Sequence, residues 1–255
     1  GPYKIKEVNL GKNITYERVK NHWAQNLPVN LGHNNFDTIH YDYYRDSNVM
    51  IEALKANEYD FRLENISKEW ATAYIDLKNN SLFIKEEIDH ELPQGMQAFI
   101  FNMRKDIFKN LQLRKALALA FDFEWTNKTL FYGQYIRSSS YFSNSDLSST
   151  GLPSKEELEI INKLKNNVSK SVINEIYDPG KTDGSGNNRK NLRKAIQILK
   201  EANYKLENNI LKNSEGKQIK FEILLISPAF ERIVGPFIKN LKKLGVEANI
   251  RIVDT

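Results

Sequence analysis

Residues 218–252, QIKFEILLISPAFERIVGPFIKNLKKLGVEANIRI, change their hydrophobic period twice within a short stretch. Gln218–Ile226 is a run of strand-forming residues, Phe230–Leu244 places apolar side chains at helical spacing, and Val246–Ile252 alternates apolar with polar residues. Gly245 follows the predicted helix, as is typical of a residue that ends one. This order predicts two parallel neighbouring strands joined by a right-handed helical crossover.

Two further amphipathic helices are expected upstream. The first carries the apolar residues Leu113, Ala116, Leu117, Ala120 and Phe121. The second carries Leu192, Ala195, Ile196 and Leu199, after a turn-rich segment at Asp178–Asn188. Apolar residues three and four positions apart form one stripe on a helix, and such a stripe packs on a core. The later part of the chain is therefore expected to hold helices packed on a sheet.

The earlier part mixes short strands and short helices. Asn13–Arg18 and Thr38–Arg45 alternate apolar or aromatic with polar residues, which predicts half-buried strands. Asn48–Asn57 and Ser67–Tyr74 have helical spacing, and Ser67 is expected to cap the second helix. Strands and helices in both parts of the chain predict the α/β class.

Charge and turn residues suggest that the 255 residues form two units. Residues 1–96 carry a formal charge of −4, and the remainder carries +9. Pro and Gly in the segment Leu92–Gly95 interrupt two strand-like runs, Leu82–Ile88 and Met96–Met103. We therefore expect one unit to span residues 1–95 and the other to span residues 96–255.

Motifs for catalysis and metal binding are missing. The chain has no cysteine, and its four histidines, His22, His33, His40 and His90, are not paired at metal-ligand spacing. No Gly-x-Ser-x-Gly motif frames a serine. No apolar run approaches the roughly 18 residues of a membrane span. We expect no catalytic residue, no metal and no cofactor.

Two rival classes of function stay open. A hydrolase-like enzyme would need a carboxylate or histidine with a strongly shifted pKa in a cleft. A nucleic-acid-binding protein would need the basic residues near Arg189–Lys194 and Lys239–Lys243 to converge, although their spacing favours solvent-exposed helix faces. Gly184–Arg189 lacks the third glycine of a phosphate-binding loop, so a solvated loop is expected there.

Aromatic residues crowd into the eighteen residues that begin at Trp125. They are Trp125, Phe131, Tyr132, Tyr135, Tyr141 and Phe142, and small polar residues such as Ser143 and Asn144 lie among or beside them. Flat apolar surface mixed with small hydrogen-bonding groups is typical of a ligand-binding wall, and core packing explains such aromatics equally well.

Several segments resemble one known family, the family 5 extracellular solute-binding proteins. The resemblance rests on Gly1–Lys4, Phe101–Arg104, Leu113–Leu117 and Ala120–Asp122, with the last three forming the most recognisable part. Further segments are similar to the Yej-type branch of the family: Gln94–Phe99, Phe121–Asn127, Leu130–Tyr135 and Ser227–Arg232. The resemblance extends over essentially the whole chain.

Membership of this family implies a two-lobe α/β fold like that of class II periplasmic binding proteins, of which this chain would be an incomplete part. Residues 1–95 would be the returning part of lobe one, and residues 96–255 most of lobe two. The function implied is that of a periplasmic, non-enzymatic receptor that delivers oligopeptides or peptide-nucleotide conjugates to the permease subunits of an ABC importer. Nucleic acid is not an expected partner.

Candidate ligand-binding residues follow from their positions and from this implied function. Glu64 and Asn65 follow a predicted strand end in the first part of the chain. The second part contributes Phe99, Phe101, Trp125, Tyr141, Phe142, Ser143, Asn144 and Ser227. The oligopeptide receptors of the family hold the peptide's ammonium group with an Asp near Ser227, whereas Ser227-Pro228-Ala229 has no carboxylate. The usual mode of amino-terminal recognition is therefore not expected here.

Overall fold

The computed structural model describes residues 1–77, 80–164 and 167–253. The chain divides into two compact units, Gly1–Ile84 and Lys85–Thr255. This division precedes the expected boundary after residue 95. The intervening segment belongs to the second unit because the Gln94 N–H donates to the Ser143 carbonyl at 2.8 Å and Asn144 donates to two of its carbonyls. The assignment of the two units to lobes stays a prediction.

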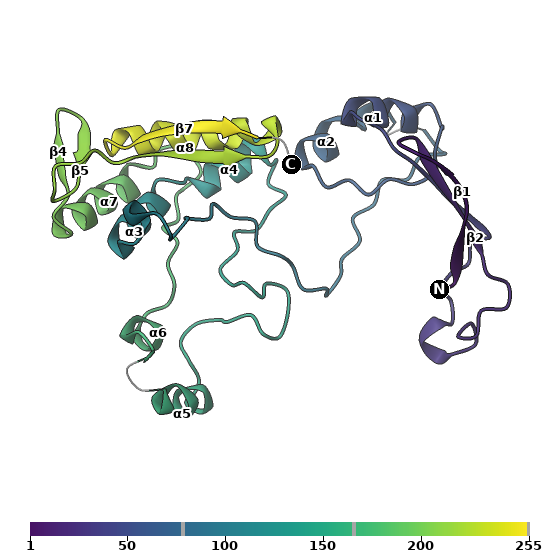
Figure 1. Ribbon diagram of the computed structural model, residues 1–255, viewed down its shortest axis with the longest axis horizontal. Coiled ribbons are helices and arrows are strands. Elements are labelled where there is room, and N and C mark those ends of the chain that lie inside the picture. Colours follow the sequence, from purple (N-terminus) through teal and green to yellow (C-terminus); the bar gives the residue numbers. More distant parts are fainter. Residues whose placement is uncertain (78–79, 165–166, 254–255) are drawn as a thin grey trace. The chain divides into compact units, whose positions relative to one another are not determined.

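The first unit contains an antiparallel three-stranded sheet followed by short helices (Figure 1). Strands β1 (Tyr3–Asn9), β2 (Asn13–Arg18) and β3 (Thr38–Asp42) are hydrogen-bonded in that order. This confirms strands at both predicted places and adds β1, which the sequence analysis did not identify. The half-buried character is confirmed for β2 but is wrong for β3, which ends at Asp42 and is mostly exposed because it lies at the edge of the sheet. The helices are η1 (Pro28–Asn30), α1 (Ser47–Lys55), α2 (Ser67–Thr72) and η2 (Ile75–Leu77), and α1 and α2 match the two predicted helices.

The predicted serine cap of α2 is wrong. Ser67 is the first residue of the helix, it is buried, and the N-cap position is Ile66, which makes no side-chain capping bond. The Ile66 N–H instead donates to the Glu64 carboxylate at 2.9 Å. A carboxylate two residues before the cap therefore satisfies a backbone donor at this helix end, where a free N–H would be costly.

The second unit packs helices beside short sheets (Figure 1). Its helices are η3 (Asp106–Phe108), α3 (Leu111–Leu119), α4 (Phe123–Leu130), α5 (Lys155–Lys163), α6 (Lys170–Asn174), α7 (Arg189–Glu201), η5 (Pro228–Phe230) and α8 (Glu231–Lys243). Its strands are β4 (Lys205–Glu207), β5 (Ile210–Lys212), β6 (Lys220–Leu225) and β7 (Glu247–Ile252). Strands β6 and β7 are parallel and joined by α8. The predicted strand–helix–strand crossover is confirmed.

The apolar face predicted around Leu113 lies at the centre of the second unit's core. Leu113, Ala116, Leu117 and Ala120 are fully buried. Helix α3 packs against α7, and α8 packs against β7. The core also includes the buried side chains Leu192, Ala195, Leu199, Phe237, Leu241, Leu244, Val246 and Ala248. These are residues of the predicted helical stripes and of the alternating strand, so periodicity located the core correctly.

The strand-like runs Leu82–Ile88 and Met96–Met103 are not strands in the described chain. A strand needs a neighbour to accept and donate its backbone hydrogen bonds, and no described segment pairs with either run. In the second run, Phe99 and Phe101 instead pack their rings against the core. Among the described residues, no helix combines the length and the apolar character that crossing a membrane would require.

Candidate functional site

The first unit holds two candidates, Glu64 and Asn65, and the strand expected directly before them is absent, since residues 61–66 lie in no helix or strand. Glu64 lies in a compact polar cluster with Arg62 and Tyr74. The Tyr74 hydroxyl donates to Glu64 Oε2 at 2.6 Å, and Arg62 Nε donates to the same oxygen at 2.9 Å. The side chains of Arg62 and Glu64 are only 9% and 4% exposed. Asn65 is exposed beside this cluster. Glu64 therefore stabilises its own unit, and Asn65 is the candidate that faces solvent.

Burial and hydrogen bonding act in opposite directions on the Glu64 carboxyl. Burial alone would raise its pKa, because a charged group loses hydration. The hydrogen bonds from Tyr74, from the Ile66 backbone and from Arg62, with the Arg62 charge, outweigh that cost and hold the pKa of Glu64 below its usual range. Burial, followed by the contact with Glu64, raises the pKa of the Tyr74 hydroxyl. The group is thus an ionised acceptor held by three donors.

Phe99 and Phe101 lie against the core of the second unit. The Phe99 ring is 5.0 Å from Phe237 and 5.5 Å from Phe121 between centroids. The Phe101 ring is 5.2 Å from Phe108. Such distances are typical of stabilising aromatic pairs. These two rings anchor the segment that carries them, and their contact with a ligand stays a prediction.

The loop at residues 140–145 exposes two aromatic side chains to solvent, and its polar side chains make hydrogen bonds within the protein. Tyr141 is 77% exposed and Phe142 is 54% exposed. The buried Ser140 hydroxyl accepts from the Phe142 N–H at 3.1 Å, and the Ser143 hydroxyl donates to the Ser140 carbonyl at 2.9 Å. Asn144 donates to the carbonyls of His90 at 2.9 Å and Leu92 at 2.8 Å. Tyr141 and Phe142 are thus the candidates available to a ligand.

Ser227 lies at the carboxyl end of β6, where it caps η5. Its hydroxyl accepts from the Ala229 N–H at 3.3 Å, and the residue is half-buried. Downstream, Arg232 donates to the Leu130 carbonyl at 2.8 Å, which ties the start of α8 to the end of α4. The end of a strand leading into a helix is a common place for ligand-binding residues in α/β proteins.

Trp125 lines a pocket of about 370 Å³ formed by α4, α8 and the loop before α7. Its other lining residues include Asp122, Ser185, Lys239, Asn240 and Lys243. Gly186 lies against the indole, and a Cβ on that glycine would be 3.0 Å from Trp125 Cδ1. Phe121, Pro236 and Phe237 add apolar surface to the pocket, so its lining is mixed, as in many small-molecule sites. This pocket lies apart in sequence from the loop at residues 140–145.

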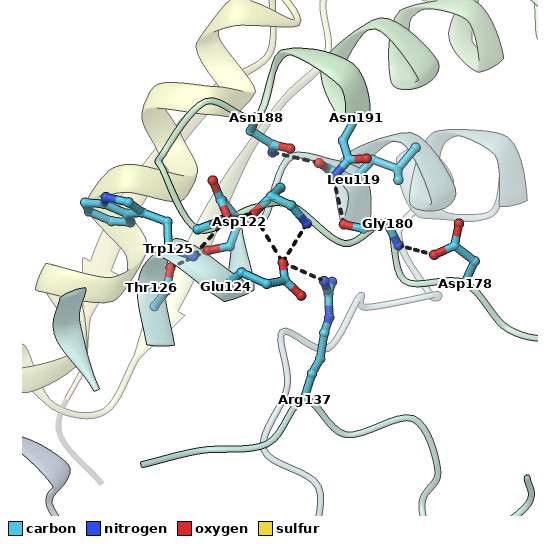
Figure 2. Close-up of polar contacts among 12 residues, drawn as sticks. Leu119, Asp122, Glu124, Trp125, Thr126, Arg137, Asp178, Gly180, Asn188 and Asn191 are labelled. Carbon is cyan, nitrogen blue, oxygen red and sulfur yellow. Dashed lines mark hydrogen bonds and ion pairs between the residues drawn. The ribbon is translucent and has the colours of Figure 1, made fainter. Parts of the chain in front are cut away.

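A polar network joins α4 to the loop before α7, as Figure 2 shows. Asp122 Oδ1 accepts from the backbone N–H of Trp125 at 3.1 Å and from the Thr182 hydroxyl at 2.6 Å. Glu124 Oε2 accepts from the Thr182 N–H at 3.0 Å and lies 3.9 Å from Arg137 Nη1. Arg137 lies in the segment that leads to residues 140–145, so this ion pair brings the base of that segment next to the network.

Buried asparagines complete this network. Asn188 Nδ2 donates to the Leu119 carbonyl at 2.9 Å, and Asn191 Nδ2 donates to the Gly180 carbonyl at 2.7 Å (Figure 2). Sequence reasoning missed these residues. Asp122 had a detectable signal, because an Asp directly before a helical segment is a preferred N-cap. The Asn188 contact had none, since its partner Leu119 is 69 residues away in the sequence, and the Asn191 contact joins a helix to a carbonyl of the irregular segment before it, which no periodicity predicts.

No group of three or more His, Asp or Glu side chains within residues 1–77, 80–164 and 167–253 is arranged to hold a metal ion. Within the second unit, the candidates fall into separate places: Tyr141 to Asn144 in one loop, Trp125 in the pocket, Ser227 at the end of β6, and the two phenylalanines against the core. The arrangement offers exposed aromatic surface and backbone groups to a ligand.

Comparison with known proteins identifies related sequences along the entire chain. Residues 1–255 match the family described as bacterial extracellular solute-binding proteins, family 5 Middle. The "Uncharacterized protein YejA" of Escherichia coli is 41% identical, and the "Probable peptide-binding protein YejA" of Agrobacterium fabrum is 42% identical. Each match covers 100% of this chain and 42% of the relative, so the chain spans about two fifths of their length.

A similar fold occurs in a solved structure. The oligopeptide-binding protein AppA of Bacillus subtilis, solved in complex with a nonapeptide, matches with a TM-score of 0.62 and 21% identity. The match covers 100% of this chain and 42% of AppA. At this identity the likeness shows the fold alone, and it agrees with the expected two-lobe binding-protein class, of which the chain covers a part.

Proposed function

The chain belongs to the bacterial extracellular solute-binding proteins of family 5, and we propose that it acts in the substrate-binding component of an ABC importer that takes up oligopeptides. The observation that carries this proposal is the similarity over the entire chain to a relative named "Probable peptide-binding protein YejA", at 42% identity. The family assignment supports a receptor located outside the cytoplasm, and we place the protein in the periplasm with the importer's permease subunits as partners.

The proposed ligand contacts come from both units. In the second unit, Tyr141 and Phe142 supply exposed aromatic surface, Ser143 and Asn144 are polar candidates in the same loop, and Ser227 is a polar candidate at the end of β6. In the first unit, Asn65 is exposed beside the Glu64 cluster. Exposed aromatic side chains bury large apolar areas at little entropic cost, so they suit a receptor that must accept many side chains. Peptide backbone groups would supply the remaining hydrogen bonds.

Recognition of the peptide's amino terminus is proposed to differ from that of receptors with an Asp after the corresponding strand. Ser227 hydrogen-bonds its own turn, and no carboxylate occurs at residues 227–229. The nearest carboxylate in the sequence, Glu231, is exposed in the first turn of α8. A free ammonium group therefore gains no charge-assisted bond at Ser227. We expect amino-terminally blocked peptides to bind this protein about as well as free ones.

The test is calorimetry of the whole protein with a pooled peptide library, with native mass spectrometry to detect co-purified peptides. Saturable binding that is insensitive to salt is the expected result, and no substrate is turned over. Peptide-nucleotide conjugates form a second arm, because they are the other proposed ligand class. Failure to bind either class would overturn the proposal. Binding of nucleic acid that weakens steeply with salt would instead support the basic nucleic-acid-binding alternative.

A further inference from the structure

The segment that opens the second unit is tied to the loop that carries Tyr141 and Phe142. Residues 85–95 are all exposed and lie in no helix or strand. Three hydrogen bonds attach this segment to the loop. Asn144 Nδ2 donates to the carbonyls of His90 at 2.9 Å and Leu92 at 2.8 Å, and the Gln94 N–H donates to the Ser143 carbonyl at 2.8 Å. We call these three bonds the Asn144 clamp.

The backbone conformation of Asn144 directs its side-chain amide toward the carbonyls of His90 and Leu92. Its φ of 60° lies in the left-handed region, which residues other than glycine rarely adopt and which asparagine tolerates best. The side-chain nitrogen donates both of its hydrogens, one to the His90 carbonyl and one to the Leu92 carbonyl, which lie 54 and 52 positions earlier in the sequence. Few side chains offer two donors from so short a stem, so the position requires asparagine.

We propose that Asn144 is a positioning residue that couples the ligand loop to the segment joining the two units. This inference revises the expectation that Asn144 itself donates to a ligand, because the two bonds occupy its amide hydrogens. Through the clamp, a ligand that immobilises Tyr141 and Phe142 also restrains residues 90–94, and a change in that segment displaces the two aromatic side chains. The coupling to a peptide ligand rests on the proposed function, whereas the clamp itself does not.

The segment itself supplies a test, because Glu91 lies between the two clamped carbonyls and Glu86 lies outside them. A glutamate-specific protease must open the segment locally before it cuts, so its rate follows the open population when reclosing is fast. Asn144→Asp keeps the shape of the side chain, but it replaces the double donor with an oxygen that repels both carbonyls. We expect cleavage after Glu91 to become about tenfold faster, as expected for the loss of two hydrogen bonds, with cleavage after Glu86 unchanged.

Two further variants separate the amide from the backbone. Asn144→Gly keeps the left-handed conformation without the amide, and it should accelerate cleavage after Glu91 as Asn144→Asp does. Asn208→Asp makes the same change at another asparagine with positive φ, in the turn between β4 and β5, and it should leave both cleavage rates unchanged. Equal rates after Glu91 in wild type and Asn144→Asp would overturn the clamp. An equal increase in the rate of cleavage after Glu86 in Asn144→Asp would also overturn the clamp, because it would mean that the whole segment opens more often and not only its clamped part.

The coupling to the ligand is tested by repeating the digestion of the whole protein with the pooled peptide library. We expect the library to slow cleavage after Glu91 in the wild type and to have no effect on that rate in Asn144→Asp. If the library binds and does not slow cleavage in the wild type, the coupling is wrong. If the library does not bind while Asn144→Asp still accelerates cleavage, the proposed function fails and the clamp stands.

Discussion

At the scale of single residues, Glu64 stabilises the first unit through hydrogen bonds within that unit. Its carboxylate accepts from Tyr74, Arg62 and the Ile66 backbone, and its pKa is lowered despite burial. A carboxyl group with a lowered folded-state pKa stabilises the fold at pH values above its ordinary pKa near 4.5. That contribution declines as the pH falls below the ordinary value, and it is lost when the pH falls through the lowered pKa.

Replacing Glu64 should therefore destabilise the first unit in a pH-dependent way. Glu64→Gln leaves the Arg62 guanidinium buried without its counter-ion, and we expect the free energy of unfolding at neutral pH to fall by about 2 to 3 kcal/mol. The difference from wild type should shrink as the pH is lowered from 5 toward 3, a window of about two units around the ordinary pKa. Urea unfolding at a series of pH values measures both effects.

The matched control for this change is Glu52→Gln. Glu52 pairs with Lys55 at 3.1 Å, and its side chain is 70% exposed. Exposed pairs contribute less than about 1 kcal/mol, so this variant should unfold nearly as wild type does. A Glu64→Gln protein with unchanged stability across the acidic range would show that the Glu64 cluster is not a stabilising one.

Tyr141 and Phe142 carry the second residue-scale prediction. Alanine at either position in the whole protein should weaken peptide binding about fivefold or more, because exposed aromatic anchors supply a large share of binding energy. Stability should change by less than about 0.5 kcal/mol, since both side chains face solvent. Calorimetric titration measures affinity, and thermal unfolding measures stability. Tyr177→Ala removes another exposed tyrosine, and equal weakening there would rule out a specific aromatic wall.

At the scale of elements, Gly245 determines how closely the β4–β5 hairpin approaches the end of α8. Its φ is +79°, and a Cβ there would lie 2.7 Å from the Leu211 backbone nitrogen and against the Leu206 side chain. The Leu211 N–H donates to the Gly245 carbonyl at 2.8 Å. A side chain at this position would therefore strain the backbone and separate the hairpin from the helix end.

We expect Gly245→Ala to lower the free energy of unfolding of the second unit by about 2 kcal/mol or more. Gly235→Ala is the control inside α8 itself, because a Cβ there meets no atom within 4 Å beyond its chain neighbours and the helix's own backbone. In a helix interior, alanine is favoured over glycine by roughly 0.5 to 1 kcal/mol, whereas Pro236 directly after it disfavours a helical conformation for a residue with a Cβ. The two effects oppose each other, so this variant should unfold close to wild type. Urea midpoints of the two variants test the pair, and a Gly245→Ala protein as stable as wild type would contradict the packing described.

Helices and strands with a strong apolar periodicity could be predicted from the sequence. Elements that are short, or that depend on pairing with a distant segment, could not. The β6–α8–β7 crossover and the face of α3 follow from repeated apolar spacing over many residues. Strands β4 and β5 have three residues each, too few for a period to be recognised. Helix α5 was missed although Ser154 and Glu157 form a capping box, a local signal that was present in the sequence.

The same distinction applies to the candidate site. The aromatic character of Tyr141 and Phe142 was visible in the sequence, and both are exposed. The role of Asn144 was not, because its two acceptors lie more than fifty residues away. Residues 82–88 and 96–103 have the composition of strands without a described pairing partner. Composition reports what a segment favours, and pairing depends on which other segment lies beside it.

At the scale of the whole molecule, the two units differ in how much apolar surface they bury. In the described part of the first unit, the buried apolar side chains are Ala24, Ile51, Ala53 and Tyr74. The second unit has a contiguous core built from α3, α7, α8 and β7. Small domains bury a smaller fraction of their surface than large ones and are correspondingly less stable. The second unit is therefore expected to supply most of the chain's stability.

Separate expression of residues 1–84 and residues 85–255 should expose this difference. We expect the larger piece to unfold cooperatively, because its core lies within its own residues, and the smaller piece to be partly unfolded or self-associated. The sheet of the smaller piece leaves β1 and β3 as edges and exposes Ile5, Val8 and Tyr41, and exposed edge strands pair with other chains. Circular dichroism with heating measures cooperativity, and sedimentation measures association. A monomeric, cooperatively unfolding piece 1–84 would show that its few buried side chains suffice, and the stability of the chain would then be shared between both units.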